Sequence, residues 1–122
     1  MADAMVIAIV DDDKAVLDAM SSFIRSLGYR VRTFQSGKAF LDHEGIGEIA
    51  CLFTDIQMPG LSGFELHDIV RLNRPAIPVV LMTALADASV RARALSSGAR
   101  CFLEKPIAGR EIMNCLSGIF DA

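Results

Sequence analysis

The feature that most constrains the fold of this chain is a regular alternation of short apolar runs with longer segments of helical character. The apolar runs, rich in β-branched residues, occupy residues 5–10, 29–34, 49–54, 79–82 and 101–103. Helices are predicted between and after them, over residues 14–27, 37–42, 63–73, 86–97 and 108–120. This strict alternation predicts an α/β fold, a (βα)5 doubly wound parallel sheet with helices on both faces.

Length and charge indicate one domain without a nucleic-acid interface of its own. A chain of 122 residues is too short for two full domains, so residues 1–122 are predicted to form a single one. Hydrophobic residues make up 52% of the chain, which suits a sheet buried on both faces. The net charge of −3 and the scattered arginines argue against nucleic-acid binding.

Cysteine and histidine usage gives no sign of a metal centre. Cys51, Cys101 and Cys115 are odd in number and lack ligand spacing, which predicts no disulfide framework, no zinc site and a reducing compartment. His43 and His67 are interpreted as surface or loop residues. The first apolar run is too short for a signal peptide or a membrane span, so the chain is predicted to be cytoplasmic, with no membrane contact.

Polar residues that suit phosphate or a cation follow the predicted strands. In doubly wound sheets the functional crevice lies at the carboxyl ends of the strands. Taken singly, each residue has a structural explanation, such as an N-cap for Asp13 or a turn former for Asp55. Because all of them occupy matching strand ends, the set is more specific than its members, which are Asp11, Asp12, Asp13, Asp55, Thr83 and Lys105.

These residue types fit phosphoryl chemistry. Two unit charges ~4 Å apart interact by about 4 kcal/mol at an effective dielectric of ~20, so clustered carboxylates need a cation. Mg²⁺ prefers oxygen ligands and suits carboxylates together with a phosphate. Asp55 would then be available as a nucleophile that forms an aspartyl phosphate, with Lys105 and Thr83 contacting the transferred oxygens.

The same motifs carry a resemblance to the receiver domain of two-component response regulators, nearest to the FixJ-like group. They are Asp-Asp-Asp at 11–13, Thr-Asp-Ile-Gln-Met-Pro-Gly at 54–60, Met-Thr-Ala at 82–84 and Phe-Leu-Glu-Lys-Pro at 102–106. The resemblance runs across nearly the whole chain. It implies the flavodoxin-like strand order 2-1-3-4-5, which alternation alone leaves open.

The resemblance also implies a role for each site residue. Asp55 is the expected phosphoacceptor for a histidine kinase, Thr83 and Phe102 are the expected switch pair, and Lys105 is the phosphate-binding lysine, followed by a cis bond to Pro106. Gln57 and Leu85 match positions that tune dephosphorylation. The expected Mg²⁺ ligands are Asp11, Asp12, Asp55 and the backbone carbonyl of Gln57.

The expected function is a phosphorylation-controlled switch with self-catalysed phosphotransfer and dephosphorylation, and not an enzyme with a separate substrate. Phosphorylation is expected to change the surface of residues 86–97, 101–103 and 108–120 and to permit homodimerisation through it. The chain is expected to be the N-terminal part of a longer transcription regulator, touching DNA only through an output domain. The alternatives are a stand-alone regulator, a phosphorelay intermediate and a degenerate receiver that acts as an interaction module.

A phosphatase with a nucleophilic aspartate is the alternative from a different class. Such enzymes usually carry a second acid two residues after the nucleophile, because general acid catalysis needs a proton donor within reach. This chain has Gln57 there, and no cap domain.

Overall fold

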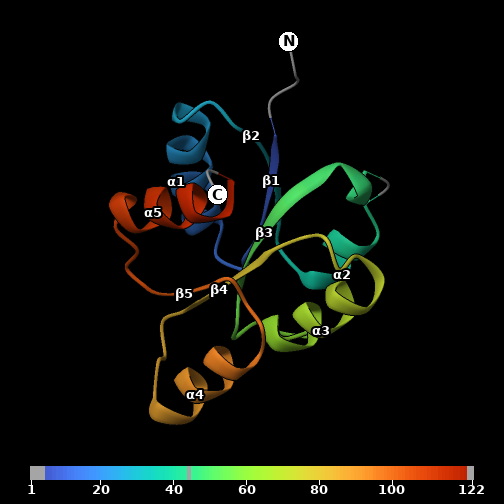
Figure 1. Ribbon diagram of the computed structural model, residues 1–122, viewed down its shortest axis with the longest axis vertical. Coiled ribbons are helices and arrows are strands. Elements are labelled where there is room, and N and C mark those ends of the chain that lie inside the picture. The colour runs from blue at the N-terminus through green and yellow to red at the C-terminus, as the bar shows by residue number, and fades with distance from the viewer. Residues whose placement is uncertain (1–4, 44, 121–122) are drawn as a thin grey trace.

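The computed structural model describes residues 5–43 and 45–120, which form one parallel sheet covered by helices (Figure 1). The strand order is β2-β1-β3-β4-β5, and every pair is parallel, so both the predicted fold class and the implied order are confirmed. The strands are β1 (Val6–Val10), β2 (Arg30–Phe34), β3 (Ile49–Asp55), β4 (Val79–Thr83) and β5 (Cys101–Glu104).

The helices begin and end within two residues of the predicted positions. Side chains cap three of the predicted N-termini, Asp13, Ser36 and Ser62, and a fourth at Asp87, since each accepts a hydrogen bond from a first-turn amide. The helices are α1 (Lys14–Ser26), α2 (Gly37–Leu41), α3 (Gly63–Asn73), α4 (Ala88–Ser96) and α5 (Gly109–Phe120), with a 3-10 turn, η1, at Ile46–Glu48.

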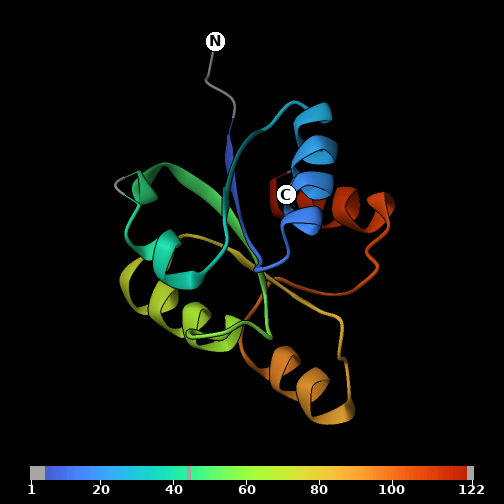
Figure 2. The ribbon, with the colours of Figure 1, turned by 180° about the vertical axis from the view of Figure 1, so that it is seen from behind.

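The helices divide into two layers, one on each face of the sheet. Helices α1 and α5 cover one face, while α2, α3 and α4 cover the other, as the front and back views show (Figures 1 and 2). Each layer closes its own apolar core against alternate residues of the same strands. Strands β1 and β4 are buried throughout, and their residues are apolar except for Thr83 at the end of β4, as expected for strands covered on both faces.

Helix α4 is the least anchored of the longer helices. Ala94 is its one buried residue among those described, and Val90 is only partly buried. Leu95, predicted to be a core residue, is 73% exposed, so that prediction was wrong. Leu95 lies outside the narrow buried side of α4, which is formed by Ala94 and Val90.

The predictions for the cysteines and one histidine also need correction. Cys101 in β5 and Cys115 in α5 form a disulfide, with Cα atoms 6.4 Å apart, within the bridging range. Packing of α5 onto β5 brings them together, which residue spacing could not reveal. Cys51 is free and buried, as expected. His43 lies in a loop, but His67 is only 4% exposed, because it lies on the inner side of α3.

Within the described ranges, no helix has the length and apolar character needed to cross a membrane.

Candidate functional site

Three carboxylates meet at the carboxyl ends of the two central strands. Asp11 and Asp12 follow β1, and Asp55 is the last residue of β3, which lies next to β1 in the sheet. One carboxylate oxygen from each lies within 4.8 Å of the others. The predicted acidic cluster is therefore formed by residues that are distant in sequence and adjacent in the sheet.

Backbone geometry fixes the Asp11 carboxylate. Its amide donates to the Phe34 carbonyl at the end of β2, and its Oδ1 accepts the Asp13 amide at 2.9 Å. Asp11 is fully buried, whereas Asp12 is exposed at the mouth of the cluster. Asp13 points away and caps α1 by accepting the Ala15 amide, as predicted.

Gly63 holds the backbone around Asp55. The first residue of α3 packs so closely on the end of β3 that a Cβ atom on Gly63 would lie 2.2 Å from the Asp55 carbonyl oxygen. The Gly63 amide also donates to the Ile56 carbonyl at 2.9 Å. Only glycine permits this approach, so the loop that follows Asp55 returns directly to the strand end.

Lys105, just after β5, brings a positive charge to the cluster. Its Nζ donates to Asp11 Oδ2 at 2.6 Å and lies 3.5 Å from Asp55 Oδ1. The Lys105–Pro106 bond that follows is cis, as the resemblance implied. When the three carboxylates are ionised, one ammonium leaves two negative charges uncompensated.

The pKa values show how unevenly this charge is shared. The pKa of Asp55 is raised to about 6, chiefly by burial and then by the Asp11 charge, and Lys105 offsets only part of this rise. Burial is also the largest single effect on Lys105 and lowers its pKa, but bonds to Asp11 and Asp55 outweigh it and leave the pKa raised. The two directions agree if Lys105 pairs mainly with Asp11, its nearer partner. Asp55 is left as the carboxylate that most needs a further cation.

That surplus of negative charge, in a half-open site with oxygen donors, fits a hard divalent cation such as Mg²⁺. The residues of this chain therefore fit the predicted metal, with Asp11, Asp12 and Asp55 as side-chain ligands.

Thr83 ends β4 beside the acidic cluster, and its hydroxyl already has two partners. It accepts the Leu85 amide at 2.9 Å and donates to Oε1 of Gln57 at 2.6 Å. Thr83 is fully buried, and Gln57 is half-buried in the loop after Asp55. This contact was not predicted from the sequence, because the Gln57 side chain was considered only for its effect on dephosphorylation.

Phe102 lies in β5 and is not part of the carboxylate cluster. It is half-buried in β5, opposite Leu81 of β4, and packs against the core layer that includes Ala94. The structure therefore brings Asp11, Asp12, Asp55 and Lys105 into one cluster. Thr83 and Gln57 form a pair beside it, and Phe102 stands apart.

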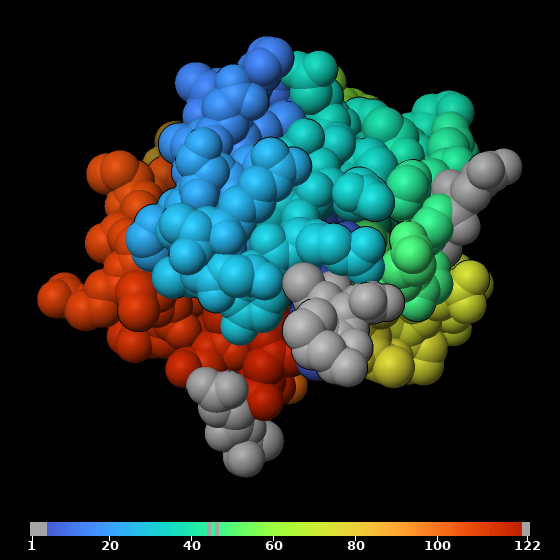
Figure 3. All heavy atoms as spheres, turned by 90° about the horizontal axis from the view of Figure 1, so that it is seen from above, coloured from blue at the N-terminus to red at the C-terminus, as the bar shows by residue number. Residues whose placement is uncertain are grey.

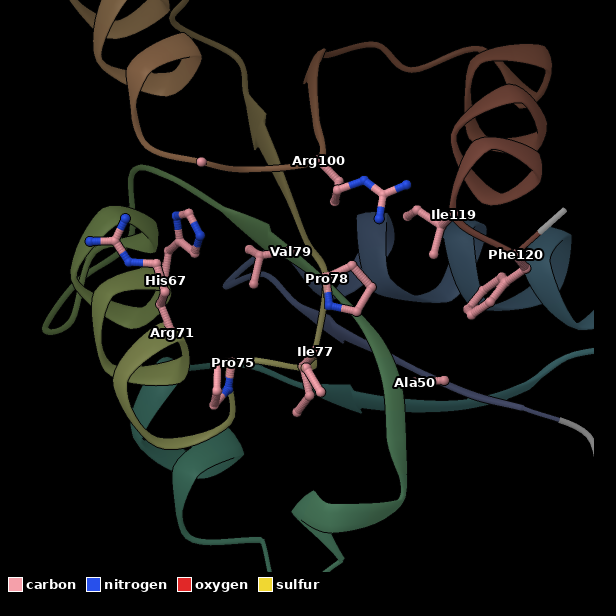
Figure 4. A pocket seen from close by; sticks show the side chains of 12 residues that line it. Ala50, His67, Arg71, Pro75, Ile77, Pro78, Val79, Arg100, Ile119 and Phe120 are labelled. Atoms are coloured by element: carbon pink, nitrogen blue, oxygen red, sulfur yellow. The ribbon is translucent and has the colours of Figure 1, made fainter. Parts of the chain in front are cut away.

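A cavity lies at the other end of the sheet. It has a volume of about 420 Å³ and is lined by residues around the start of β4, with His67 and Arg71 from α3 and Ile119 and Phe120 from α5 (Figure 4). A view onto this end shows α1 and β2 beside α5 (Figure 3). The cavity contains none of the predicted site residues, so the chemistry is assigned to the acidic cluster.

Comparison with known proteins gives concordant matches. A model of the response regulator receiver domain matches residues 7–117. The response regulator protein TmoT of Ectopseudomonas mendocina is 36% identical over 111 residues, covering 91% of this chain and 50% of that protein. The transcriptional regulatory protein FixJ of Bradyrhizobium diazoefficiens is 35% identical over 100 residues, covering 82% and 49%.

Solved structures agree. The BeF3-activated receiver domain of DrrB superposes with a TM-score of 0.89 at 28% identity, covering 98% of this chain and 99% of that one. The chain spans about half the length of the curated relatives that it matches.

Proposed function

This chain belongs to the response regulator receiver domain family, and on that premise we propose that Asp55 accepts a phosphoryl group from a histidine kinase. Its relatives are response regulators and transcriptional regulators of two-component systems, in which such regulators are paired with histidine kinases. The observation that carries the proposal is the position of Asp55, buried within 4.8 Å of two other carboxylates and beside a lysine.

In the proposed transfer, an Asp55 carboxylate oxygen attacks the phosphorus atom. The bond from phosphorus to the kinase histidine nitrogen breaks, that nitrogen keeps the electron pair, and Asp55 becomes an aspartyl phosphate. Asp11, Asp12, Asp55 and the Gln57 backbone carbonyl would hold Mg²⁺, which supplies positive charge to the phosphoryl oxygens. Lys105, 3.5 Å from Asp55, supports the new charge from the β5 side.

The added phosphoryl group, roughly −1.5 to −2 charges at pH 7, is the proposed signal. The Thr83 hydroxyl turns toward it, Phe102 moves inward, and the surface formed by α4, β5 and α5 changes its preferred partner. Weak anchoring of α4 supports this proposal, because a thinly packed helix is displaced at low cost. The change is a population shift, limited by how differently the phosphoryl group contacts the two states.

The rest of the proposal concerns a longer protein. It places residues 1–122 as a single receiver domain in a cytoplasmic transcription regulator, with DNA bound by an output domain and a homodimer formed through the α4, β5 and α5 surface. Relatives about twice as long support this arrangement. Self-catalysed loss of the phosphoryl group to water completes the cycle. The phosphatase alternative needs an acid where this chain has Gln57, whose side chain is bonded to Thr83.

The test is intact-mass analysis after incubation with acetyl phosphate and Mg²⁺. The unaltered protein should gain the mass of one phosphoryl group, and EDTA should suppress the gain. Asp55→Asn should gain nothing, whereas Asp18→Asn, which alters an exposed aspartate on α1, should behave like the unaltered protein. A full adduct on Asp55→Asn, or none on the unaltered protein, would overturn the assignment.

A further inference from the structure

We propose that the Gln57 side chain is a latch that holds the Thr83 hydroxyl in the resting state and must release it before the switch can turn. This inference deepens the proposed function and rests on it. The Gln57 Oε1 atom lies 2.6 Å from Thr83 Oγ1, although the two residues are 26 positions apart and follow different strands. The latch is the Gln57 side chain in this hydrogen bond.

The hydrogen bonds around Thr83 define which atom donates. A threonine hydroxyl has one proton to donate and two lone pairs with which to accept. The Leu85 amide already supplies a proton to the hydroxyl oxygen at 2.9 Å. The hydroxyl proton therefore needs an acceptor of its own, and the amide oxygen of Gln57 provides it.

This stoichiometry makes the two states exclusive. Phosphoryl oxygens are acceptors, so Thr83 can bind one only by donating the same single proton that Gln57 holds. Because Thr83 is fully buried, leaving its hydroxyl proton without an acceptor in the resting state would cost free energy. Gln57 removes that cost before phosphorylation and thereby biases the protein toward the resting arrangement.

Gln57 is well placed to let go. Its amide is half-buried, so water can satisfy it once Thr83 has turned away, whereas the Thr83 hydroxyl would exchange Gln57 for the phosphoryl group. The two partners therefore fare differently after release: water hydrates the Gln57 amide, and the phosphoryl group binds the Thr83 hydroxyl. Its role is to position Thr83, and it is separate from the role proposed for the Gln57 backbone carbonyl.

The probe is beryllofluoride with Mg²⁺, because it adds to an aspartate without being hydrolysed and so excludes any effect on dephosphorylation. Gln57→Met keeps the length of the side chain and removes the acceptor. We expect it to bind beryllofluoride about two- to tenfold more tightly than the unaltered protein, from the net strength of one hydrogen bond. The measurement is a titration at fixed Mg²⁺, followed by amide NMR.

A double-mutant cycle separates the latch from other roles of Gln57. In Thr83→Val, which is close in shape but has no hydroxyl, Gln57→Met should change the beryllofluoride affinity by less than about twofold. In Thr83→Ser, which keeps the hydroxyl, the tightening should return. In the free protein, Gln57→Met should also move the Leu85 amide resonance toward its position in the beryllofluoride complex.

Equal tightening in the valine and serine backgrounds, or weaker binding by Gln57→Met, would overturn the latch. Gln57→Asn, whose acceptor is one methylene shorter, provides a second variant that should match Gln57→Met. If the unaltered protein bound beryllofluoride but showed no coupling between the two positions, the latch alone would fail. If it bound none and took no phosphoryl group from acetyl phosphate, the proposed function would fail as well.

Discussion

At the scale of single residues, the site depends on an unequal division of charge. Lys105 is drawn to Asp11, and Asp55 remains a buried carboxylate whose ionisation is costly. A carboxylate held in this way is poorly stabilised in its ionised form until a cation is bound beside it. Because the raised pKa makes ionisation of Asp55 costly in the folded state, the stability of the folded protein should depend on pH.

Asp55→Asn should stabilise the metal-free protein at pH 8 by about 1–3 kcal/mol, with the gain fading toward pH 4. The folded pKa of Asp55 is about 6, against an ordinary value of 3.8. Between these values the folded state binds the proton and the unfolded state does not, so the Asp55 contribution to stability falls as pH rises toward 6 and is then lost. Urea unfolding in EDTA at several pH values measures it.

Asp18→Asn is the control for that pH series, since Asp18 is exposed and its ion pair is with Lys14, across one turn of α1. It should give a difference below about 1 kcal/mol. A gain for Asp55→Asn that did not change with pH would show that burial of the charge is not its cause.

At the scale of elements, α3 and α4 differ in how they are attached to the rest of the molecule. Helix α3 begins against the strand that carries Asp55, with a capping box between Ser62 and Glu65. Helix α4 is held instead from its edges: Arg91 pairs with Glu104 of β5, and the Arg93 guanidinium lies 4.2 Å from the Phe64 ring centroid. Helix α3 is therefore tied closely to the strand that carries Asp55, and α4 is the less firmly packed of the two, which is why the proposed switch assigns the movement to α4.

Gly63→Ala should destabilise the protein by about 1–3 kcal/mol, because the added methyl group would force the start of α3 away from β3. It should also lower the yield of acetyl phosphate adduct, since the displaced backbone carries Asp55. The matched control is Gly118→Ala in α5, where a Cβ meets nothing within 4 Å and the helix should gain about 1 kcal/mol. Thermal unfolding compares them; equal effects would disprove the close-approach explanation.

Amides of α4 should exchange with deuterium faster than those of α1, by roughly tenfold or more, because opening α4 uncovers little apolar surface. Native-state hydrogen exchange followed by mass spectrometry measures both helices in one sample. Protection of α4 equal to that of α1 would contradict the proposal that α4 is the responsive element.

At the scale of the whole molecule, the fold brings three carboxylates together, so a cation bound by them should stabilise the folded state. At ten times its Kd, Mg²⁺ should raise the free energy of unfolding by about 1.4 kcal/mol. Asp12→Asn, which changes an exposed ligand, should remove most of the gain without disturbing the core. Melting temperatures in Mg²⁺ and in EDTA test this, and an undiminished gain in Asp12→Asn would remove Asp12 from the ligand set.

Much of this molecule could be predicted from its sequence, because strand ends are visible as polar residues after apolar runs. Asp55, Thr83 and Lys105 were predicted to share one end of the sheet, and they do. Strand order was not predictable from alternation, since any right-handed arrangement of the same units would satisfy it. The disulfide at Cys101 and the burial of His67 depend on how helices settle on the sheet, which periodicity does not specify.

The ion pair between Lys105 and Asp11 joins residues 94 positions apart, across β1, β3, β4 and β5. Asp55 lies in β3, between them in the sequence, so a chain in which β5 has not yet joined the sheet would lack the Lys105 charge beside these carboxylates. The charge balance of the cluster is therefore complete only when β5 pairs with β4.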